Sequence, residues 1–210
     1  MIANKLKQEL LKSHACDLDT NAVLTGIYFN CKNAVSTNGT RLFICDKPLE
    51  LSGIYKTDLS GIIEGTYPTY ENLIPKKQDA LNTCFMAFNK EDLKDFVIAL
   101  KGIPVNKRTQ IVKLFFGNHF LSISTGSENM TFTSNLTAPA HLQKENDDGL
   151  QLALNVNYFI DIFNLVLKDK PLCTVNFNLY YFGEISPLLI EIVYGDIEIG
   201  TSLIMPVQLK

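Results

Sequence analysis

The chain has 210 residues, of which 46% are hydrophobic and 20% charged, so it is long enough to bury a substantial core. No window approaches the roughly 18 consecutive apolar residues of a membrane-spanning helix, and the five scattered cysteines contain no C-x-x-C pair. We therefore expect a cytoplasmic protein without a membrane span, a disulfide framework or a zinc site. The net charge of -3 argues against a uniformly basic nucleic-acid binder, although lysines gathered on one face could still contact DNA.

The first 13 residues predict an amphipathic helix with a basic side. Ile2, Leu6, Leu10 and Leu11 recur at helical spacing, and the lysines fall on the other faces. Three segments rich in Val, Ile, Tyr and Phe follow, and Asn and Gly residues separate them. We expect strands joined by tight turns at AVLTGIYFN (22–30), KNAVSTNG (32–39) and TRLFICDKP (40–48).

A β-α-β-β-β unit then occurs twice in the remaining chain. FNKEDLKDFVIALK (88–101) and LNVNYFIDIFNLVLK (154–168) align with an offset of 66 residues, which matches Asn89 to Asn155 and Asp95 to Asp161. Each predicted helix follows a short strand, CFMAF or LQLAL. Three strands are expected after each helix, at 109–117, 119–125, 129–136 and at 173–182, 188–195, 198–207. The charged segment 141–149 is the expected linker between the two units.

The segment 49–79 between the first helix unit and these two units is too short for another full unit and holds no convincing helix. We interpret it as a repeat that has lost its middle. The boundary then falls near Pro75, between residues 1–75 and a complete C-terminal domain of residues 76–210. The expected fold class is α+β.

No catalytic or metal-binding pattern occurs in the sequence. The histidines at 14, 119 and 141 are far apart, and each is more typical of a surface or strand residue than of a metal ligand. There is no GxSxG elbow and no P-loop, and Asp147 with Asp148 is best interpreted as a solvated pair in the linker. We expect a protein that is not an enzyme, with no metal and no cofactor.

Four separated motifs, taken together and in this order, resemble the bacterial DNA polymerase III beta subunit, the replicative sliding clamp. That family has a T-D-G-H-R-L segment, an F/Y-P-D-Y segment leading to a Leu/Ile-Pro domain junction, a final helix, and a C-terminal M-P-M/V-R-L. The counterparts here are TNGTRL (37–42), YPTY with IP (67–70 and 74–75), the helix that begins LNVNYF (154–159), and MPVQL (205–209). Asn38, Thr40, Thr69 and Gln208 depart from the family pattern.

The resemblance covers nearly the whole chain, but only the second and third of the three clamp domains, with the second domain incomplete. It implies a DNA-clamp fold built from repeated β-α-β-β-β units, with helices on one side of a mainly antiparallel sheet shell. In that family the helices face double-stranded DNA inside a ring and touch phosphates without reading bases. The side chains expected to face DNA are Lys5, Lys7, Lys12, Lys90, Lys94, Lys101, Lys107 and Arg108. Ordinary solvated helix faces are the alternative interpretation of these residues.

The resemblance also implies a groove between the two parts that binds short linear motifs of DNA polymerase and clamp-loader type proteins. Its expected residues are Leu24, Thr37, Gly39, Thr40, Arg41, Leu42, Pro68, Asn72, Leu73, Asn155, Tyr158, Met205, Pro206 and Val207. Simple packing of a domain interface is the alternative for these side chains. The family builds its rings from twelve repeats, so this chain would act on DNA only as a homo-oligomer. The alternative function is a clamp-derived adaptor, decoy or regulator that keeps the groove without encircling DNA.

Overall fold

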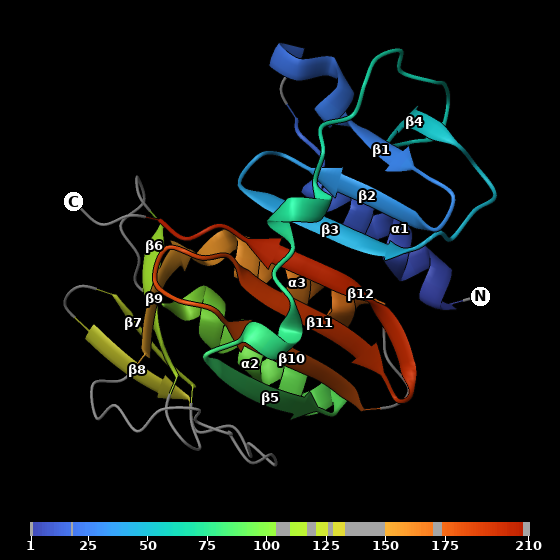
Figure 1. Ribbon diagram of the computed structural model, residues 1–210. Helices are drawn as coiled ribbons and strands as arrows, with labels where there is room; N and C mark the ends of the chain where they lie inside the picture. Colours follow the sequence, from blue (N-terminus) through green and yellow to red (C-terminus); the bar gives the residue numbers. More distant parts are fainter. Residues whose placement is uncertain are drawn as a thin grey trace.

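The computed structural model describes residues 2–17, 19–103, 110–116, 121–125, 128–132, 150–169 and 174–207. These residues form three α-helices, three short 3-10 segments and twelve strands (Figure 1). The N-terminal elements are α1 (Ile2–His14), η1 (Asp19–Thr25), β1 (Gly26–Phe29), β2 (Asn33–Thr37), β3 (Arg41–Asp46) and β4 (Gly53–Lys56). The later elements are η2 (Glu71–Leu73), η3 (Lys77–Asp79), β5 (Asn82–Phe88), α2 (Lys90–Gly102), β6 (Ile111–Phe116), β7 (Leu121–Thr125), β8 (Glu128–Phe132), β9 (Leu150–Asn155), α3 (Val156–Lys168), β10 (Val175–Tyr181), β11 (Leu188–Tyr194) and β12 (Ile197–Ile204).

The strands form two antiparallel sheets. The larger has eight strands in the order β4-β1-β2-β3-β12-β11-β10-β5, and the smaller has four in the order β8-β7-β6-β9. The larger sheet therefore runs from the N-terminal part into the C-terminal part without interruption. The α+β class and the mainly antiparallel sheets predicted from the sequence are confirmed.

All three helices lie on one side of the larger sheet (Figure 1). Alternation along the strands sends Phe29, Phe43 and Phe177 toward the helices, where they join one core with Leu10 and Phe163. The smaller sheet adds its own apolar residues to the same core, from β6, β7 and β9. One continuous core therefore fixes the helices against both sheets.

The predicted repeat is confirmed, although its helices begin two residues later than the aligned segments 88–101 and 154–168. Helices α2 and α3 both have 13 residues, and each begins directly after one of the aligned asparagines. The side chain of Asn89 accepts a hydrogen bond from the backbone N–H of Asp92, and Asn155 accepts one from Asn157. The two units also exchange their first strands, because β5 pairs with β10 and β9 pairs with β6.

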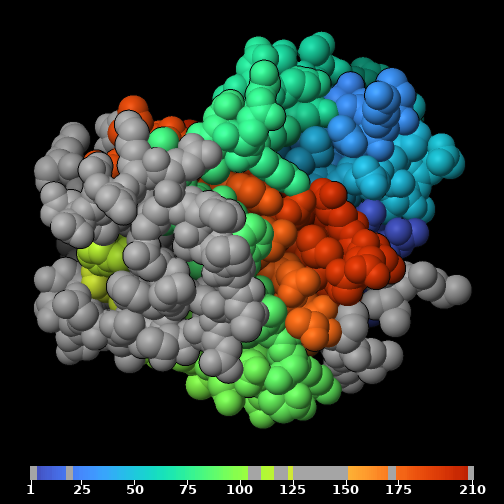
Figure 2. All heavy atoms as spheres, turned by 60° about the horizontal axis from the view of Figure 1, so that its bottom comes forward, coloured from blue at the N-terminus to red at the C-terminus, as the bar shows by residue number. Residues whose placement is uncertain are grey.

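The segment 57–79, which we call the strap, crosses the sheet face opposite the helices. Its Tyr67 and Tyr70 are buried against Val35, Leu42 and Leu203. Further along, Lys77 forms an ion pair with Glu191 of β11. Figure 2 shows the green strap in contact with both the cyan N-terminal part and the red C-terminal strands. The expected boundary near residue 75 falls inside this strap, between η2 and η3.

Three expectations from the sequence need correction. Residues 22–25 belong to η1, and strand β1 begins only at Gly26, where a Cβ atom would lie 2.6 Å from the backbone oxygen of Tyr55 on β4. Strand β4 itself pairs with β1 and adds a fourth strand to the N-terminal part. His14 is completely buried rather than lying on the surface or in a strand. The expected linker 141–149 lies outside the described residues.

Candidate peptide-binding site and helical face

The two halves of the chain meet along one strand pair, β3 with β12. Leu42 lies opposite Leu203 in this pair, and their side chains are only 4% and 3% exposed. Both side chains point to the sheet face that carries the strap, where Leu24 packs against them. The pair therefore forms an apolar floor made from both ends of the chain. Leu203 was not among the predicted groove residues.

The turn between β2 and β3 is fixed at one end of this floor. The side-chain oxygen of Asn38 accepts hydrogen bonds from the backbone N–H groups of Thr40 and Arg41, each at 3.0 Å. Gly39 has a φ of +86°, a conformation that other residues rarely adopt. The backbone N–H of Met205 donates to the carbonyl of Thr40 at 2.8 Å. The chain after β12 is thus held against this turn.

The remaining predicted groove residues are exposed or half-buried. Met205 is 41% exposed and Leu73 is 56% exposed. Pro68 and Asn72 are also exposed, whereas Thr37, Pro206 and Val207 are half-buried. The N–H of Val207 donates to the carbonyl of Ala153 at 2.8 Å, and this contact directs the chain across the start of the C-terminal repeat. Met205 directly follows β12, so an exposed apolar side chain lies next to the strand that carries the buried Leu203.

Among the predicted groove residues, Arg41, Tyr158 and Asn155 are the ones expected to bind the backbone or polar side chains of a partner, and all three already have partners within the chain. Arg41 forms an ion pair with Asp161 at 2.8 Å, donates to the carbonyl of Ser13, and lies over the ring of Tyr158. Only 10% of the Arg41 side chain is exposed. The hydroxyl of Thr40 donates to that of Tyr158 at 2.9 Å. Asn155 caps helix α3, so direct contacts of these residues with a partner stay predictions.

A buried histidine supports the same region from the helical side of the sheet. His14 Nδ1 donates to the carbonyl of Leu10 at 2.8 Å, and its Nε2 accepts from the hydroxyl of Ser202 at 2.8 Å. Burial, followed by the charge of Arg41, lowers the pKa of His14 from 6.5 to about 3. Sequence reasoning missed His14, Ser202 and Asp161 because no local motif marks them and their partners are far away along the chain.

The predicted DNA-facing residues are only partly assembled on the helical face. Lys5, Lys12, Lys90, Lys94 and Lys101 are exposed. Lys7 must be removed from the set, because it is only 8% exposed. It lies one turn from Leu11 on the side of α1 that packs on the sheet, so its stem is covered. Lys107 and Arg108 lie outside the described residues.

The exposed and half-buried charges of the three helices almost cancel. They comprise the exposed lysines at 5, 12, 90, 94, 101 and 168, the exposed carboxylates at 91, 92 and 95, and the half-buried carboxylates at 9 and 161. Two of the lysines have partners within the chain: Lys12 pairs with Glu9 at 3.1 Å, and Lys101 donates to Asn164 at 3.1 Å. The helical face is therefore only weakly positive.

Other site types find no support in the part of the chain that the structure describes. Its histidines, cysteines and carboxylates form no group of three that could hold a metal ion. Among the same residues, no helix is long and apolar enough to cross a membrane.

Comparisons with known proteins find similarity only in structure, since no protein-family model and no curated protein matches the sequence. The DNA polymerase sliding clamp from Bacillus subtilis gives a TM-score of 0.73 at 16% identity, covering 100% of this chain and 62% of that chain. DNA polymerase III subunit beta from Borrelia burgdorferi, in complex with a natural product, gives 0.71 at 18% identity with the same coverage. The DNA polymerase III subunit beta from Pseudomonas aeruginosa gives 0.68 at 15% identity, covering 99% of this chain and 65% of that chain.

The similarity extends over both parts of the chain, but this chain spans only about 62% of the length of the first two structures. The four motifs lie at the β2–β3 turn, in the strap, at the start of α3 and after β12. They therefore occur in a chain whose fold is similar to that of the family with which they were compared. The resemblance is confirmed at the level of the fold: this chain has the sliding-clamp fold of the bacterial DNA polymerase III beta subunit.

Proposed function

We propose that this protein is a sliding-clamp-like processivity factor that recruits DNA polymerase and clamp-loader type proteins through the groove at the β3–β12 seam. The observation that supports this most directly is the buried pair Leu42 and Leu203 beside the exposed Met205. A partner's Leu or Phe side chain would cover Met205 and pack beside this buried pair. Anchors of this kind dominate the affinity of short linear motifs.

Calorimetry with a clamp-binding peptide from a DNA polymerase tests the groove. The full chain is compared with a chain truncated after Ile204, which keeps β12 complete and removes the Met205 wall. The truncation should weaken binding by about 2 kcal/mol or more if Met205 and its neighbours anchor the peptide. Equal affinity for the folded, truncated chain would refute the groove assignment.

We further propose that the protein holds double-stranded DNA in the cytoplasm as a homo-oligomer, through the helical side of the sheet. All three helices share that side, and a contact through lysines on flexible stems needs no base sequence. Three helices cannot surround a duplex, so further copies must complete a ring. Strands β4 and β5 are the edges of the larger sheet, and such edges are available to pair with another chain.

Retention on DNA tests this second part. A closed ring should dissociate more slowly from circular DNA than from linear DNA with free ends, since sliding off requires an end. Replacing Lys90, Lys94 and Lys101 with Gln should weaken retention on every sequence alike and lower its salt dependence. A monomeric mass at high protein concentration, together with equal dissociation from both DNAs, would contradict this role.

The adaptor function remains a second candidate because the exposed and half-buried charges of the helices almost cancel. Six lysines against five carboxylates provide little net attraction for phosphates. An adaptor would bind the polymerase peptide in the groove and would not need DNA. The peptide and DNA experiments therefore separate the two candidates.

A further inference from the structure

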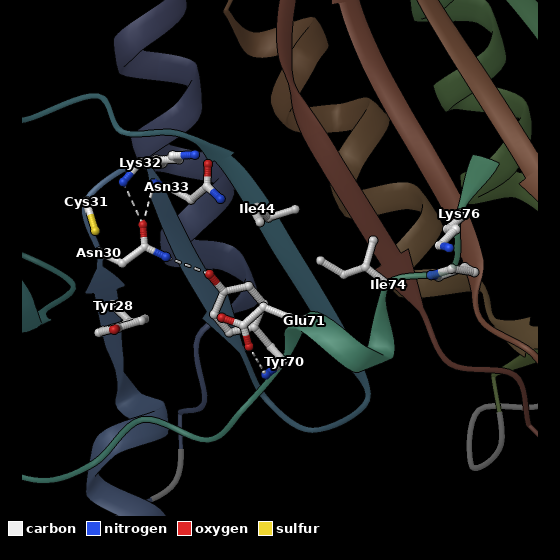
Figure 3. A pocket seen from close by; sticks show the side chains of 11 residues that line it. Tyr28, Asn30, Cys31, Lys32, Asn33, Ile44, Tyr70, Glu71, Ile74 and Lys76 are labelled. Carbon is white, nitrogen blue, oxygen red and sulfur yellow. Dashed lines mark hydrogen bonds between the residues drawn. The ribbon is translucent and has the colours of Figure 1, made fainter. Parts of the chain in front are cut away.

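A second pocket lies on the strap side of the sheet, away from the groove. It is an open depression with a volume of about 680 Å³, lined by the β1–β2 turn, by Ile44 of β3 and by the strap around Tyr70 and Ile74 (Figure 3). None of the predicted groove residues lines it. Residues 30–33 of its wall lie at the end of β2 opposite to the β2–β3 turn, so the pocket and the groove occupy different ends of the same strands.

The walls of this pocket are fixed by internal hydrogen bonds. The amide of Asn30 donates to the hydroxyl of Tyr70 at 2.8 Å and thereby joins the β1–β2 turn to the strap. The side-chain oxygen of Asn30 accepts hydrogen bonds from the backbone N–H groups of Lys32 and Asn33, at 2.8 and 2.7 Å. Tyr70 itself is only 4% exposed. A ligand would thus meet a preformed shape and would not have to order the walls on binding.

The pocket combines an apolar centre with unpaired cations. Ile44 and Ile74 point toward one another in the middle, while Lys32 and Lys76 lie at opposite ends in Figure 3. Neither of these lysine side chains forms an ion pair with the described residues, whereas Lys47 and Lys77 nearby do. Glu71, the acidic group of the lining, belongs to the strap, and its carboxylate accepts a hydrogen bond from the backbone N–H of Tyr70 at 3.1 Å.

We propose that this pocket binds an extended peptide segment in which aliphatic residues are flanked by carboxylates. The aliphatic side chains would cover Ile44 and Ile74, and the flanking carboxylates would pair with Lys32 and Lys76. Such a segment complements both features of the pocket, its apolar middle and its positive ends. This is a binding site in addition to the groove of the proposed function.

Single-stranded nucleic acid is the competing ligand for a site with tyrosines and lysines, and the rings argue against it. Base binding needs an open aromatic face. Tyr70 is buried, and the ring of Tyr28 is stacked on Tyr67 at 5.1 Å between centroids. Stacking thus covers one face of the Tyr28 ring, whereas Ile44 and Ile74 give the pocket an aliphatic surface.

The exposed thiol of Cys31, which lines the pocket, makes occupancy measurable. The probe is the fluorescein-labelled peptide Glu-Glu-Ile-Val-Glu-Glu, followed by anisotropy and by iodoacetamide alkylation of Cys31 with mass spectrometry. At saturation, the peptide should slow Cys31 alkylation about tenfold and leave Cys16 unchanged, because only the pocket is covered. The matched peptide Lys-Lys-Ile-Val-Lys-Lys should give no protection.

Two sets of variants locate the binding. The double variant Lys32→Glu, Lys76→Glu should bind the acidic peptide at least about tenfold more weakly, since both end charges are reversed. The matched double variant Lys90→Glu, Lys94→Glu on α2 and the groove variant Met205→Ala should bind it as the unmodified chain does. Circular dichroism confirms that each variant is folded. Unchanged affinity of the Lys32 and Lys76 variant, unprotected Cys31, or protection by a ten-nucleotide oligo(dT) in place of the peptide would each overturn the proposal.

Discussion

The guanidinium carbon of Arg41 lies 4.6 Å from the ring centroid of Tyr158, which joins the first residue of β3 to helix α3. The same side chain pairs with Asp161 and contacts the last turn of α1 through the carbonyl of Ser13. One planar cation therefore connects three elements that are distant in sequence. Arginine suits this position because it can donate in several directions while its face covers an aromatic ring.

We expect Arg41→Ala to lower the free energy of unfolding by about 1–3 kcal/mol, because it removes a charged hydrogen bond and the ring contact at a nearly buried site. Asp161 is 45% exposed, so water can solvate its carboxylate after the change and keeps the cost below that of a fully buried pair. Urea unfolding measures the loss. Arg41→Lys is the matched control: it should recover part of the stability, and full recovery would mean that the planar fork is unimportant.

The buried His14 should make stability depend on pH. Its pKa is about 3 in the folded chain and 6.5 when exposed, so unfolding takes up a proton between these pH values. Stability should therefore fall as the pH drops below 6.5, by up to about 1.4 kcal/mol per pH unit.

His14→Gln tests this dependence, because glutamine can still donate to Leu10 and accept from Ser202 but does not titrate. The variant should be less stable than the unmodified chain at pH 7, and its stability should change less between pH 6.5 and pH 5. Urea unfolding at a series of pH values gives both curves. Parallel curves for the two proteins would show that His14 is not the titrating group.

If the groove binds peptides as proposed, substitutions at Leu203 and Met205 should have different effects. One should lower the stability of the fold, and the other should lower peptide affinity. Leu203→Ala should cost about 2–4 kcal/mol of stability, since its side chain is almost fully buried. Met205→Ala should change stability by less than about 0.5 kcal/mol, and it should weaken the binding of a polymerase peptide by about 2 kcal/mol.

Ile197→Ala, at the other end of β12 and 58% exposed, is the matched control for the Met205 variant. It should alter neither stability nor peptide affinity by more than about 0.5 kcal/mol. Thermal unfolding and calorimetry measure the two quantities on the same samples. Equal peptide affinities of the Met205 and Ile197 variants would remove Met205 from the groove.

The ion pair between Lys77 and Glu191 should hold the end of the strap on the sheet. Burial raises the pKa of Glu191, but hydrogen bonds from Lys77, Asn178 and Tyr180 outweigh it, so the pKa is lowered overall. Because this carboxyl pKa is lowered, the ion pair stabilises the fold at pH values above the ordinary pKa of 4.5. This stabilisation is lost as the pH falls below that value.

We expect Glu191→Ala to speed tryptic cleavage after Lys76 and Lys77 by about threefold or more at pH 7, because the strap opens more often. Mass spectrometry of timed digests identifies the cuts. Glu198→Ala removes an exposed carboxylate from β12 and should leave the cleavage rate unchanged. Equal rates for both variants would show that other contacts hold the strap.

Local patterns in the sequence were sufficient to predict most of the elements and their repetition. The asparagines at 89 and 155 mark the starts of two helices of equal length, because a side-chain cap depends only on residues two or three positions away. The strands β2 and β3 were predicted from another local signal, apolar segments separated by Asn and Gly. Strand β4 was missed because four residues with glycine at the start give almost no periodic signal.

The contacts within the site depend on tertiary structure and could not be predicted from local patterns. The charge of Asp161 was visible in the repeat, but its partner Arg41 lies 120 residues away. Lys7 looked exposed because basic residues normally are, and only the packing of α1 on the sheet covers it. The second pocket has no motif, since a turn and a strap that are distant in sequence form it together.

The position of β12 also constrains the order in which the molecule can be completed. This strand lies between β3 and β11 in the larger sheet, yet of the described strands it is the last to be synthesised. Before β12 is synthesised, the larger sheet therefore exists as two separate parts. The N-terminal strands form one part, and β5, β10 and β11 form the other, each with an unpaired apolar edge strand. Nascent chains in this state would be the form most prone to pair with one another and most dependent on chaperones, and the groove at the seam would close last.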